Sequence, residues 1–394
     1  MIDKQLQAYR IYQRFLQTLL SICGCWYMPT KSGKSTYYWS ICTLLAMITY
    51  TITNLNMSYN LRHDLRNMMK AIGITTAGVS AILKVTSFMI HRGSLINYHR
   101  TLNNLFEEEL MQNEKIRMII FSPLRTMYTM AYTYFTVMTA LVLTYFAPSY
   151  IIIIRHFLLH FHLTTNYTLP LTKGFGYFWT VPDNFLYHFH LLYETSMVIL
   201  SCTTATSVDS MFGFYVYQFT STIRAMTFKL TNPPLTETFS NLLRICVAKH
   251  QRLLQCRQTL EYVYGPIIFW HIIINAVHLC ALIYDTMLFV DFNLSNALEF
   301  LSFAAVKLIQ TFTYAWYGTI LINAGDDFRK GIYFAEWPNS DLDHHMRTNI
   351  ILMMMQKPMI INTFFSPVDV IMFTNSFYNR LAHCQTAKGR QFVL

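Results

Sequence analysis

Apolar stretches that alternate with polar ones divide the chain into candidate membrane spans. Six of these stretches are long enough to cross a bilayer, because a helix rises about 1.5 Å per residue and the hydrocarbon core is about 30 Å thick. They cover residues 37–57, 71–90, 127–154, 186–208, 264–284 and 297–323. Because backbone polar groups inside the lipid must be satisfied within the segment, the pattern predicts an all-α membrane protein.

A seventh apolar stretch, residues 350–381, differs from the others because its later part is polar. That part contains Asp369, Thr374, Asn375, Ser376, Asn379 and Arg380. Polar groups in a spanning helix are tolerated where they face protein or a water-filled cavity. We therefore predict seven transmembrane helices, with the seventh at about residues 368–381 and lining a pore.

A helix that starts at Asp369 places several side chains on one face. These predicted pore-lining residues are Thr374, Tyr378, Leu381 and Gln385. An apolar ring at Leu381 would gate the pore by dewetting, while Thr374 and Gln385 would replace part of an ion's hydration shell.

The distribution of basic residues orients the spans. Of the 30 Lys and Arg residues, 20 fall in the N-terminal tail and the loops on its side, and 8 fall in the other loops and the C-terminal end. The positive-inside rule then predicts a cytoplasmic N-terminus and, with seven spans, an extracellular C-terminus. This distribution favours membrane lipids over nucleic acid as the partner of a chain with net charge +10.

The three Asn-x-Ser/Thr sequons agree with this orientation. They begin at Asn56, Asn166 and Asn293, each in or at the edge of a loop that the charge distribution places outside. Glycosylation requires that face, so we predict these asparagines as acceptors. A G-protein-coupled receptor has its N-terminus outside, which contradicts both signals.

The chain is predicted to form a single subunit with five consecutive segments. Residues 5–20 have the spacing of an amphipathic helix that packs against the bundle or lies on the membrane surface. Beyond residue 208 the helical pattern continues into basic sequence, which predicts two long helices in the cytoplasm. The segments are the tail (1–36), the first four spans (37–208), the cytoplasmic helices (209–264), the fifth and sixth spans (265–323), and a further helix with the pore-lining seventh span (324–394).

Composition supports the membrane class and argues against catalysis. Hydrophobic residues make up 53% of the chain and charged residues 13%, about half the charged share of an average soluble domain. The chain lacks the sequence patterns of metalloproteases, serine hydrolases and P-loop enzymes. Cys23-Gly-Cys25 has no second Cys/His pair nearby, so we expect no metal, no cofactor and no enzyme activity.

The outer halves of the second, third, fourth and sixth spans are rich in aromatic, Met and Thr side chains. Such faces suit a small, mostly apolar ligand held by apolar burial and a few hydroxyls. The candidate ligand-binding residues are Thr76, Thr139, Leu143, Phe146, His190, Tyr193, Met197, Leu200, Phe300 and Phe303. The same residues at helical spacing are also typical of an ordinary bundle core, and this alternative stays open.

Two lysines, Lys84 and Lys307, lie within predicted spans. A charge near the bilayer centre costs at least about 2.5–3.5 kcal/mol, so both lysines should face the bundle and find partners. Glu194 in the fourth span is a candidate partner for either.

Motifs in the last quarter of the chain resemble one receptor family. Tyr314-Ala-Trp-Tyr-Gly318, Tyr333 fifteen residues after that glycine and Trp337 four further on are similar to the end of the sixth span of insect odorant receptors. Gln356-Lys357-Pro358, followed by Phe364, Phe365, Asp369 and Ser376, resembles the start of that family's seventh span. His250-Gln-Arg-Leu-Leu254 is similar to a segment of the family's anchor domain. Ala315 departs from the usual cysteine, and the chain continues past the usual end.

The resemblance implies a tuning subunit rather than the shared co-receptor. Such a subunit binds a small volatile in its outer half and forms a nonselective cation channel with co-receptor subunits, as a heterotetramer held by the anchor domain. It also implies the plasma membrane of a sensory dendrite. The alternatives are a gustatory-type receptor that assembles as a homotetramer, a G-protein-coupled receptor, and a secondary transporter, for which we find no interrupted spans in two halves.

Overall fold

The computed structural model describes residues 2–28, 37–63, 65–160, 186–233, 238–288, 294–335, 344–355, 359–363, 367–371 and 374. Within them the chain forms ten helices and, apart from an isolated bridge between Asn362 and Pro367, no β-structure. The all-α prediction is confirmed. The helices are α1 (Ile2–Ile22), α2 (Tyr37–Asn60), α3 (Leu65–Ile90), α4 (Arg92–Leu110), α5 (Glu114–Phe121), α6 (Leu124–His160), α7 (Leu186–Thr231), α8 (Phe239–Leu288), α9 (Leu294–Tyr333) and α10 (His344–Met355).

Each of the six long apolar stretches lies inside one helix, namely α2, α3, α6, α7, α8 and α9 in chain order. By length and hydropathy alone, three stretches among the described residues could cross a membrane. These are Ala71–Ile90, Glu114–Ala147 and His188–Thr231. The helices extend beyond the apolar runs because the backbone hydrogen bonds of a helix do not depend on apolar side chains.

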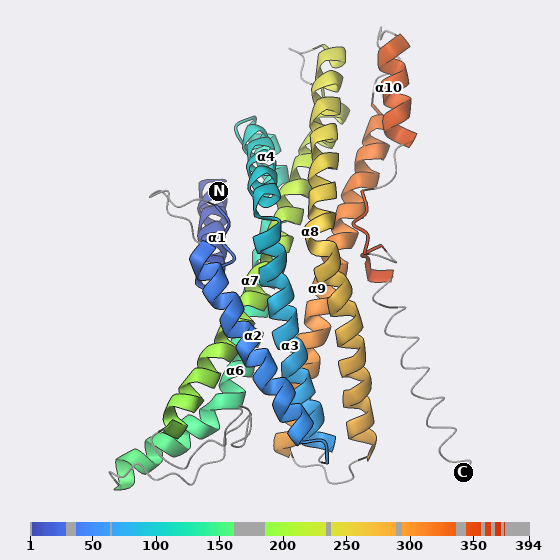
Figure 1. Cartoon of the computed structure of the whole chain (residues 1–394). Coiled ribbons are helices and arrows are strands. Elements are labelled where there is room, and N and C mark those ends of the chain that lie inside the picture. The colour runs from blue at the N-terminus through green and yellow to red at the C-terminus, as the bar shows by residue number, and fades with distance from the viewer. Residues whose placement is uncertain are drawn as a thin grey trace, which may run out of the picture.

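Three helices are much longer than a bilayer is thick. α7 has 46 residues, α8 has 50 and α9 has 40. At about 1.5 Å per residue they span roughly 60–75 Å. In Figure 1 they rise from the lower to the upper part of the molecule, where α10 stands beside the end of α8, while α2 and α3 stay lower. α7 passes through Asp209 without a break, as its periodicity predicts.

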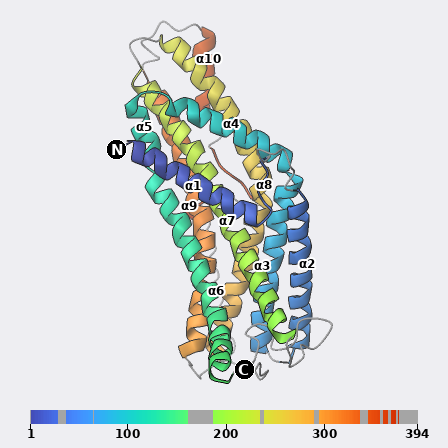
Figure 2. The same cartoon turned by 90° about the vertical axis from the view of Figure 1, so that its left-hand side faces the viewer.

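The N-terminal helix α1 packs against the bundle, which is one of the two arrangements expected for the amphipathic tail. The rings of Tyr9 and Tyr12 lie 5.7 and 5.9 Å from the ring of Phe214 on α7. The amide of Gln218, also on α7, donates a hydrogen bond of 2.9 Å to the Tyr9 hydroxyl. Figure 2 shows α1 crossing α7 at an angle, so it fastens the middle of that helix.

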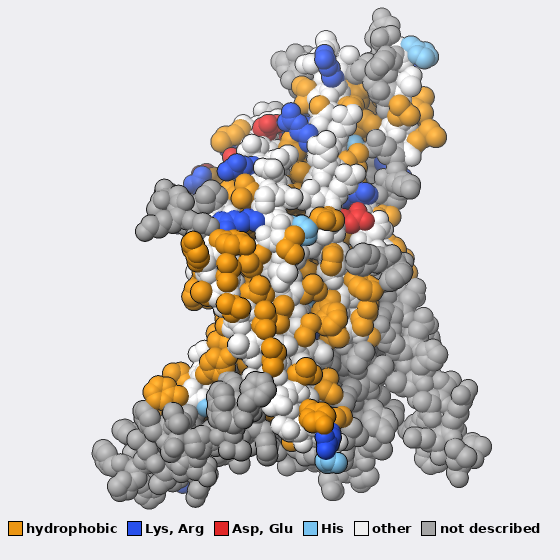
Figure 3. All heavy atoms as spheres, viewed as in Figure 1, with side chains coloured by type: hydrophobic (Ala, Val, Ile, Leu, Met, Phe, Trp, Pro, Cys, Tyr) orange, Lys and Arg blue, Asp and Glu red, His pale blue; other side chains and the backbone are white. Residues whose placement is uncertain are grey.

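The face shown in Figure 3 has an apolar band across the middle of the molecule. Figure 3 shows hydrophobic side chains covering this band, with Lys and Arg side chains gathered above them. On α2 the exposed side chains include Trp39, Leu45, Ile52 and Leu55. A protein that is monomeric in water rarely exposes such a contiguous apolar surface, whereas a lipid-facing belt bordered by basic residues is expected of a membrane protein.

Candidate ligand site and pore segment

The predicted ligand residue Phe146 lies in a small apolar cluster where three helices meet. Phe146 of α6 and Leu191 of α7 are buried together, and Ile74 of α3 packs against them. The three side chains come from the second, third and fourth predicted spans. Of the candidate ligand residues, Phe146 is therefore packed between three of the predicted spans.

Polar side chains join the helices at the same level. The hydroxyls of Tyr193 on α7 and Thr49 on α2 are 3.3 Å apart. The Tyr150 hydroxyl of α6 lies 3.0 Å from that of Thr195 on α7. Hydroxyl pairs of this kind can each exchange one hydrogen bond for a bond to a ligand's polar group, so they suit the orienting role that a mostly apolar pocket requires.

A histidine and a glutamate lie one turn apart on α7 beside these hydroxyls. Nε2 of His190 is 3.8 Å from Oε1 of Glu194, and both side chains are buried. A buried carboxylate thus lies next to the candidate ligand residue Tyr193 and one turn from His190 on α7.

Other candidate ligand residues are less enclosed. Leu143 is 60% exposed, Thr139 is also exposed, and Thr76, Met197 and Leu200 are half-buried. In Figure 1 the lower ends of α6 and α7 lean away from α8 and α9. The side chains of Phe300 and Phe303 lie outside the described part of the chain.

A buried carboxylate that the sequence analysis did not single out holds the centre of the bundle. Asp209 of α7 is 2% exposed and forms an ion pair of 2.6 Å with Lys84 of α3. Oδ2 of Asp209 accepts hydrogen bonds from the Tyr134 hydroxyl of α6 at 3.1 Å and from the Gln310 amide of α9 at 2.8 Å. The Tyr314 hydroxyl of α9 donates to Oδ1. One carboxylate thus joins four helices.

A further helix, α8, joins the partners of Asp209 through His271. Its Nε2 lies 3.4 Å from the Gln310 amide nitrogen and 3.3 Å from the Ser80 hydroxyl of α3, and its ring stacks on Tyr314 with centroids 5.9 Å apart. We call Lys84, Tyr134, Asp209, His271, Gln310 and Tyr314 the Asp209 cluster.

The predicted partner of one buried lysine, Lys84, is wrong. The partner proposed for Lys84 was Glu194, but Lys84 pairs with Asp209 instead. The hydropathy pattern does not indicate Asp209 as a buried group, because the apolar run ends at Val208 and the residue falls in the predicted cytoplasmic helices. The available signal was a lone acidic residue at the end of a span that contains few charges, since such a residue requires a buried cation.

Residues 367–371, where the predicted seventh span begins, dock on α9, and we call them the pore segment. The Val370 backbone N–H donates a 3.0 Å hydrogen bond to the Thr319 hydroxyl. The Val368 carbonyl occupies the space that a Cβ at Gly318 would need, so only glycine permits this close approach. Thr374 is exposed, and the other predicted pore-lining residues, Tyr378, Leu381 and Gln385, lie outside the described residues.

The predicted glycosylation acceptors are only partly covered by the structure. Asn56 is half-buried on α2. Asn166 and Asn293 lie outside the described residues.

A second buried ion group lies in the upper part of the molecule, among the helices predicted to be cytoplasmic. Glu109 of α4 is fully buried and accepts from Lys229 of α7 at 2.6 Å and from Lys249 of α8 at 2.7 Å. Burial lowers the pKa of Lys249, but its bonds to Glu109 and Glu108 outweigh burial, and the net pKa is raised. These pairs fix α4 to the extended parts of α7 and α8.

His250 is the next residue on α8 and meets α9. Its ring stacks on Phe328 with centroids 5.1 Å apart. Burial lowers the pKa of His250 from 6.5 to about 4, so the imidazole is neutral at physiological pH. Within the described residues no group of three or more His, Cys, Asp or Glu side chains could hold a metal ion.

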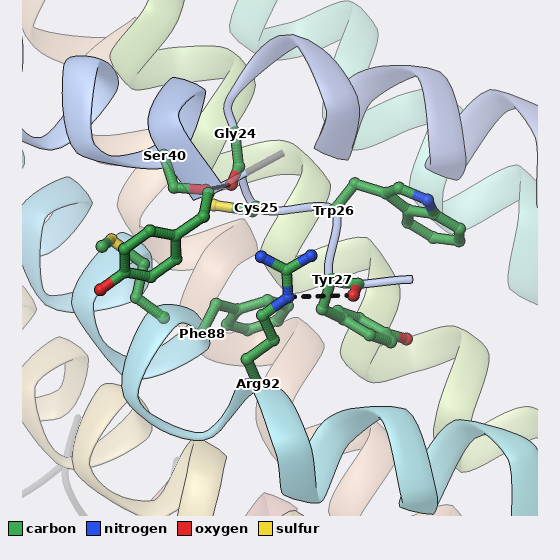
Figure 4. A pocket seen from close by; sticks show the side chains of 9 residues that line it. Gly24, Cys25, Trp26, Tyr27, Ser40, Phe88 and Arg92 are labelled. Atoms are coloured by element: carbon green, nitrogen blue, oxygen red, sulfur yellow. Dashed lines mark hydrogen bonds between the residues drawn. The ribbon is translucent and has the colours of Figure 1, made fainter. Parts of the chain in front are cut away.

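A small cavity lies between the first connecting segment and α3. Figure 4 shows Gly24, Cys25, Trp26, Phe88 and Arg92 around it, with Arg92 Nε donating to the Tyr27 carbonyl at 3.2 Å. Its volume of about 10 Å³ is close to that of a single water molecule. An organic ligand needs a far larger space, so this cavity is not a candidate odorant site.

Comparison with known proteins places the chain in a family. A family model described as 7tm odorant receptor matches residues 64–377. The chain belongs to the odorant receptor family. Its members are ligand-gated channels rather than enzymes, which supports the assignment of this chain as a transmembrane receptor in olfaction.

Individual odorant receptors are similar to the chain over much of its length. Odorant receptor 49a of Drosophila melanogaster is 21% identical over 289 residues, which are 72% of this chain and 71% of the relative. Odorant receptor 9a of the same species is 23% identical over 181 residues, or 44% of each chain.

The fold of the chain matches a solved odorant receptor. The structure of the insect olfactory receptor OR5 from Machilis hrabei in complex with eugenol covers 96% of this chain and 97% of its own, with a TM-score of 0.76 and 15% identity. The structure of the same receptor described without eugenol gives a TM-score of 0.70. At this identity the likeness establishes the fold.

Proposed function

We propose that the chain is the odorant-binding, tuning subunit of a ligand-gated nonselective cation channel. The observation that carries this proposal is the docking of the pore segment, where the predicted seventh span begins, on α9 at Gly318 and Thr319. A polar helix that follows a segment held on the inner bundle avoids lipid and can face water, as a pore helix must.

The ligand is a small volatile that binds in the outer half of the bundle. The apolar cluster around Phe146, with the hydroxyls of Tyr193 and Tyr150 beside it, supplies apolar area and a few polar groups. These features suit an aromatic or aliphatic odorant with one oxygen function. Because eugenol is bound in the solved relative, it is a sensible member of the first odorant panel.

The proposed partners are odorant co-receptor subunits in a heterotetramer at the plasma membrane of a sensory neuron, with the N-terminus in the cytoplasm. Exposed apolar side chains at the ends of α9 and α10 support assembly through this region. They are Tyr333, Phe334, Ile351, Leu352 and Met355. Such side chains beyond the membrane favour burial against another subunit.

The test is whole-cell current under a panel of volatiles that includes eugenol, in cells that express this chain alone or with the co-receptor, with a G-protein blocker present. We expect a fast, blocker-insensitive cation current only in the co-expressing cells. Current from the chain alone would instead indicate a self-sufficient, gustatory-type channel. A response abolished by the blocker would contradict the channel mechanism.

A further inference from the structure

We propose that the Asp209 cluster is the joint through which the odorant-binding helices control the position of the pore segment. The inference rests on the proposed channel function, because it gives the cluster a part in opening. It assigns Tyr314 and Gln310 as positioning residues that act on the pore through α9.

The first step of the argument is that the Asp209 carboxylate fixes α9 to the helices of the predicted pocket. Gln310 and Tyr314, one turn apart on α9, both donate to it. Lys84 brings α3 to the same carboxylate, and Tyr134 brings α6. These are the second and third spans, which carry candidate ligand residues, so a shift of either helix changes the bonds that hold α9.

The second step is that packing contacts extend from Tyr134 toward the predicted pocket. Tyr134 belongs to an apolar cluster with Met138 of α6 and Val306 of α9, and Cys202 and Ala205 of α7 pack against it. Met138 adjoins Thr139, and Cys202 lies two residues from Leu200. Packed side chains therefore extend from the carboxylate's partner Tyr134 to the turns of α6 and α7 that carry the candidate ligand residues Thr139 and Leu200.

The third step is that α9 carries the pore segment on its next turn. Tyr314 is four residues before Gly318 and five before Thr319, which hold Val368 and Val370. A helix of hydrogen-bonded turns moves as a unit over so short a distance.

The packing of α7 on α9 in this region is close as well. The Tyr317 ring occupies the space of a Cβ at Gly213, one turn beyond Asp209 on α7. A carboxylate at one turn and a glycine at the next thus fix α9 against α7. The pore segment can follow a movement of the pocket helices only if these contacts are kept.

Two tyrosines provide a matched test because both donate to Asp209. Tyr314→Phe removes the bond from α9, which carries the pore segment, and Tyr134→Phe removes the bond from α6. Each change deletes one buried hydroxyl and keeps the ring. If the cluster only stabilises the bundle, both variants should change the amide exchange of residues 367–371 equally. If the cluster positions the pore segment through α9, Tyr314→Phe should have the larger effect.

The measurement is amide hydrogen exchange of the peptide 367–371 in the full-length protein, purified with its co-receptor in lipid nanodiscs. We expect Tyr314→Phe to accelerate exchange there by about tenfold, the size expected for a lost hydrogen bond to a charged group. Tyr134→Phe should stay within about twofold of the wild type. Gln310→Leu, which removes the other bond from α9, should behave like Tyr314→Phe.

Equal acceleration by both tyrosine variants would show that the cluster acts through general stability, and would overturn the proposal. Unchanged exchange in Tyr314→Phe and Gln310→Leu would overturn it too. A third variant, Tyr217→Phe, removes a buried hydroxyl that donates to the Ile120 carbonyl at 3.1 Å, far along the sequence from the pore segment. It should leave exchange at 367–371 unchanged. Because the readout needs neither odorant nor current, failure of the proposed channel function would be seen separately.

Discussion

Removal of the cation from the Asp209 cluster should destabilise the whole bundle. In Lys84→Met a methionine of similar length fills the space, and the carboxylate of Asp209 stays buried without a positive partner. Breaking a buried ion pair by removal of one member costs about 3–5 kcal/mol. Asp209 keeps the neutral donors Tyr134, Gln310 and Tyr314, so we expect the lower end of that range, about 3 kcal/mol.

The assay is thermal unfolding of the purified protein in nanodiscs, read from tryptophan fluorescence. A loss of about 3 kcal/mol should lower the midpoint by roughly 3–5 °C for a chain of this size. The double variant Lys84→Met with Asp209→Asn removes both charges and keeps an acceptor for the tyrosines, so it should recover at least half of the loss.

The control is Lys115→Met, which removes an exposed lysine of α5 and should change stability by less than about 0.5 kcal/mol. If Lys84→Met unfolded within about 1 °C of the wild type, or if the double variant were less stable than the single one, Asp209 would not depend on Lys84 for its charge. The reasoning about the buried pair would then be wrong.

The other predictions concern the ligand site, pH and topology. Phe146→Ala should weaken the response to whichever panel volatile activates the wild type by at least about tenfold in half-maximal concentration, while Leu143→Ala, on the exposed face of α6, should shift it by less than about twofold. Because the pKa of His250 falls from 6.5 to about 4 on folding, its neutral form is favoured, and stability should fall by up to about 3 kcal/mol between pH 6.5 and 4. His250→Phe should flatten that part of the pH profile of the unfolding midpoint. Asn166→Gln should abolish one glycosidase-sensitive gel shift, and an unaltered shift would argue against an extracellular loop there.

Hydrophobic patterning was enough to predict the six long apolar helices, because length and apolar content determine which segments can lie in a bilayer, but it did not predict α4 and α5 between the second and third spans. The apolar run of the fourth span ends at Val208, and α7 continues for another 23 residues to Thr231, as the helical pattern beyond residue 208 predicts. The backbone bonds of a helix are the same in lipid and beyond it, so hydropathy marks where lipid ends rather than where a helix ends.

The partners of the buried charges could not be predicted from the sequence. The requirement that Lys84 find a partner follows from the cost of burying a charge, and this requirement is met. Which acid it meets depends on how α3 is placed along and around α7. That placement is set by close packing at many positions, such as Tyr317 against Gly213, none of which has a signature in the sequence of one helix.

The length of α7 has a mechanical consequence. This helix carries candidate odorant residues near one end, the Asp209 carboxylate in its middle and a lysine of the Glu109 ion group near the other end, in 46 residues without an interruption. A rod about 69 Å long that tilts by about 5° around its centre moves each end by roughly 3 Å, in opposite directions. The Asp209 carboxylate lies at the point about which the helix would tilt. Odorant binding near one end of α7 would then displace the other end, on the opposite side of the membrane, and so act on any subunit that contacts it.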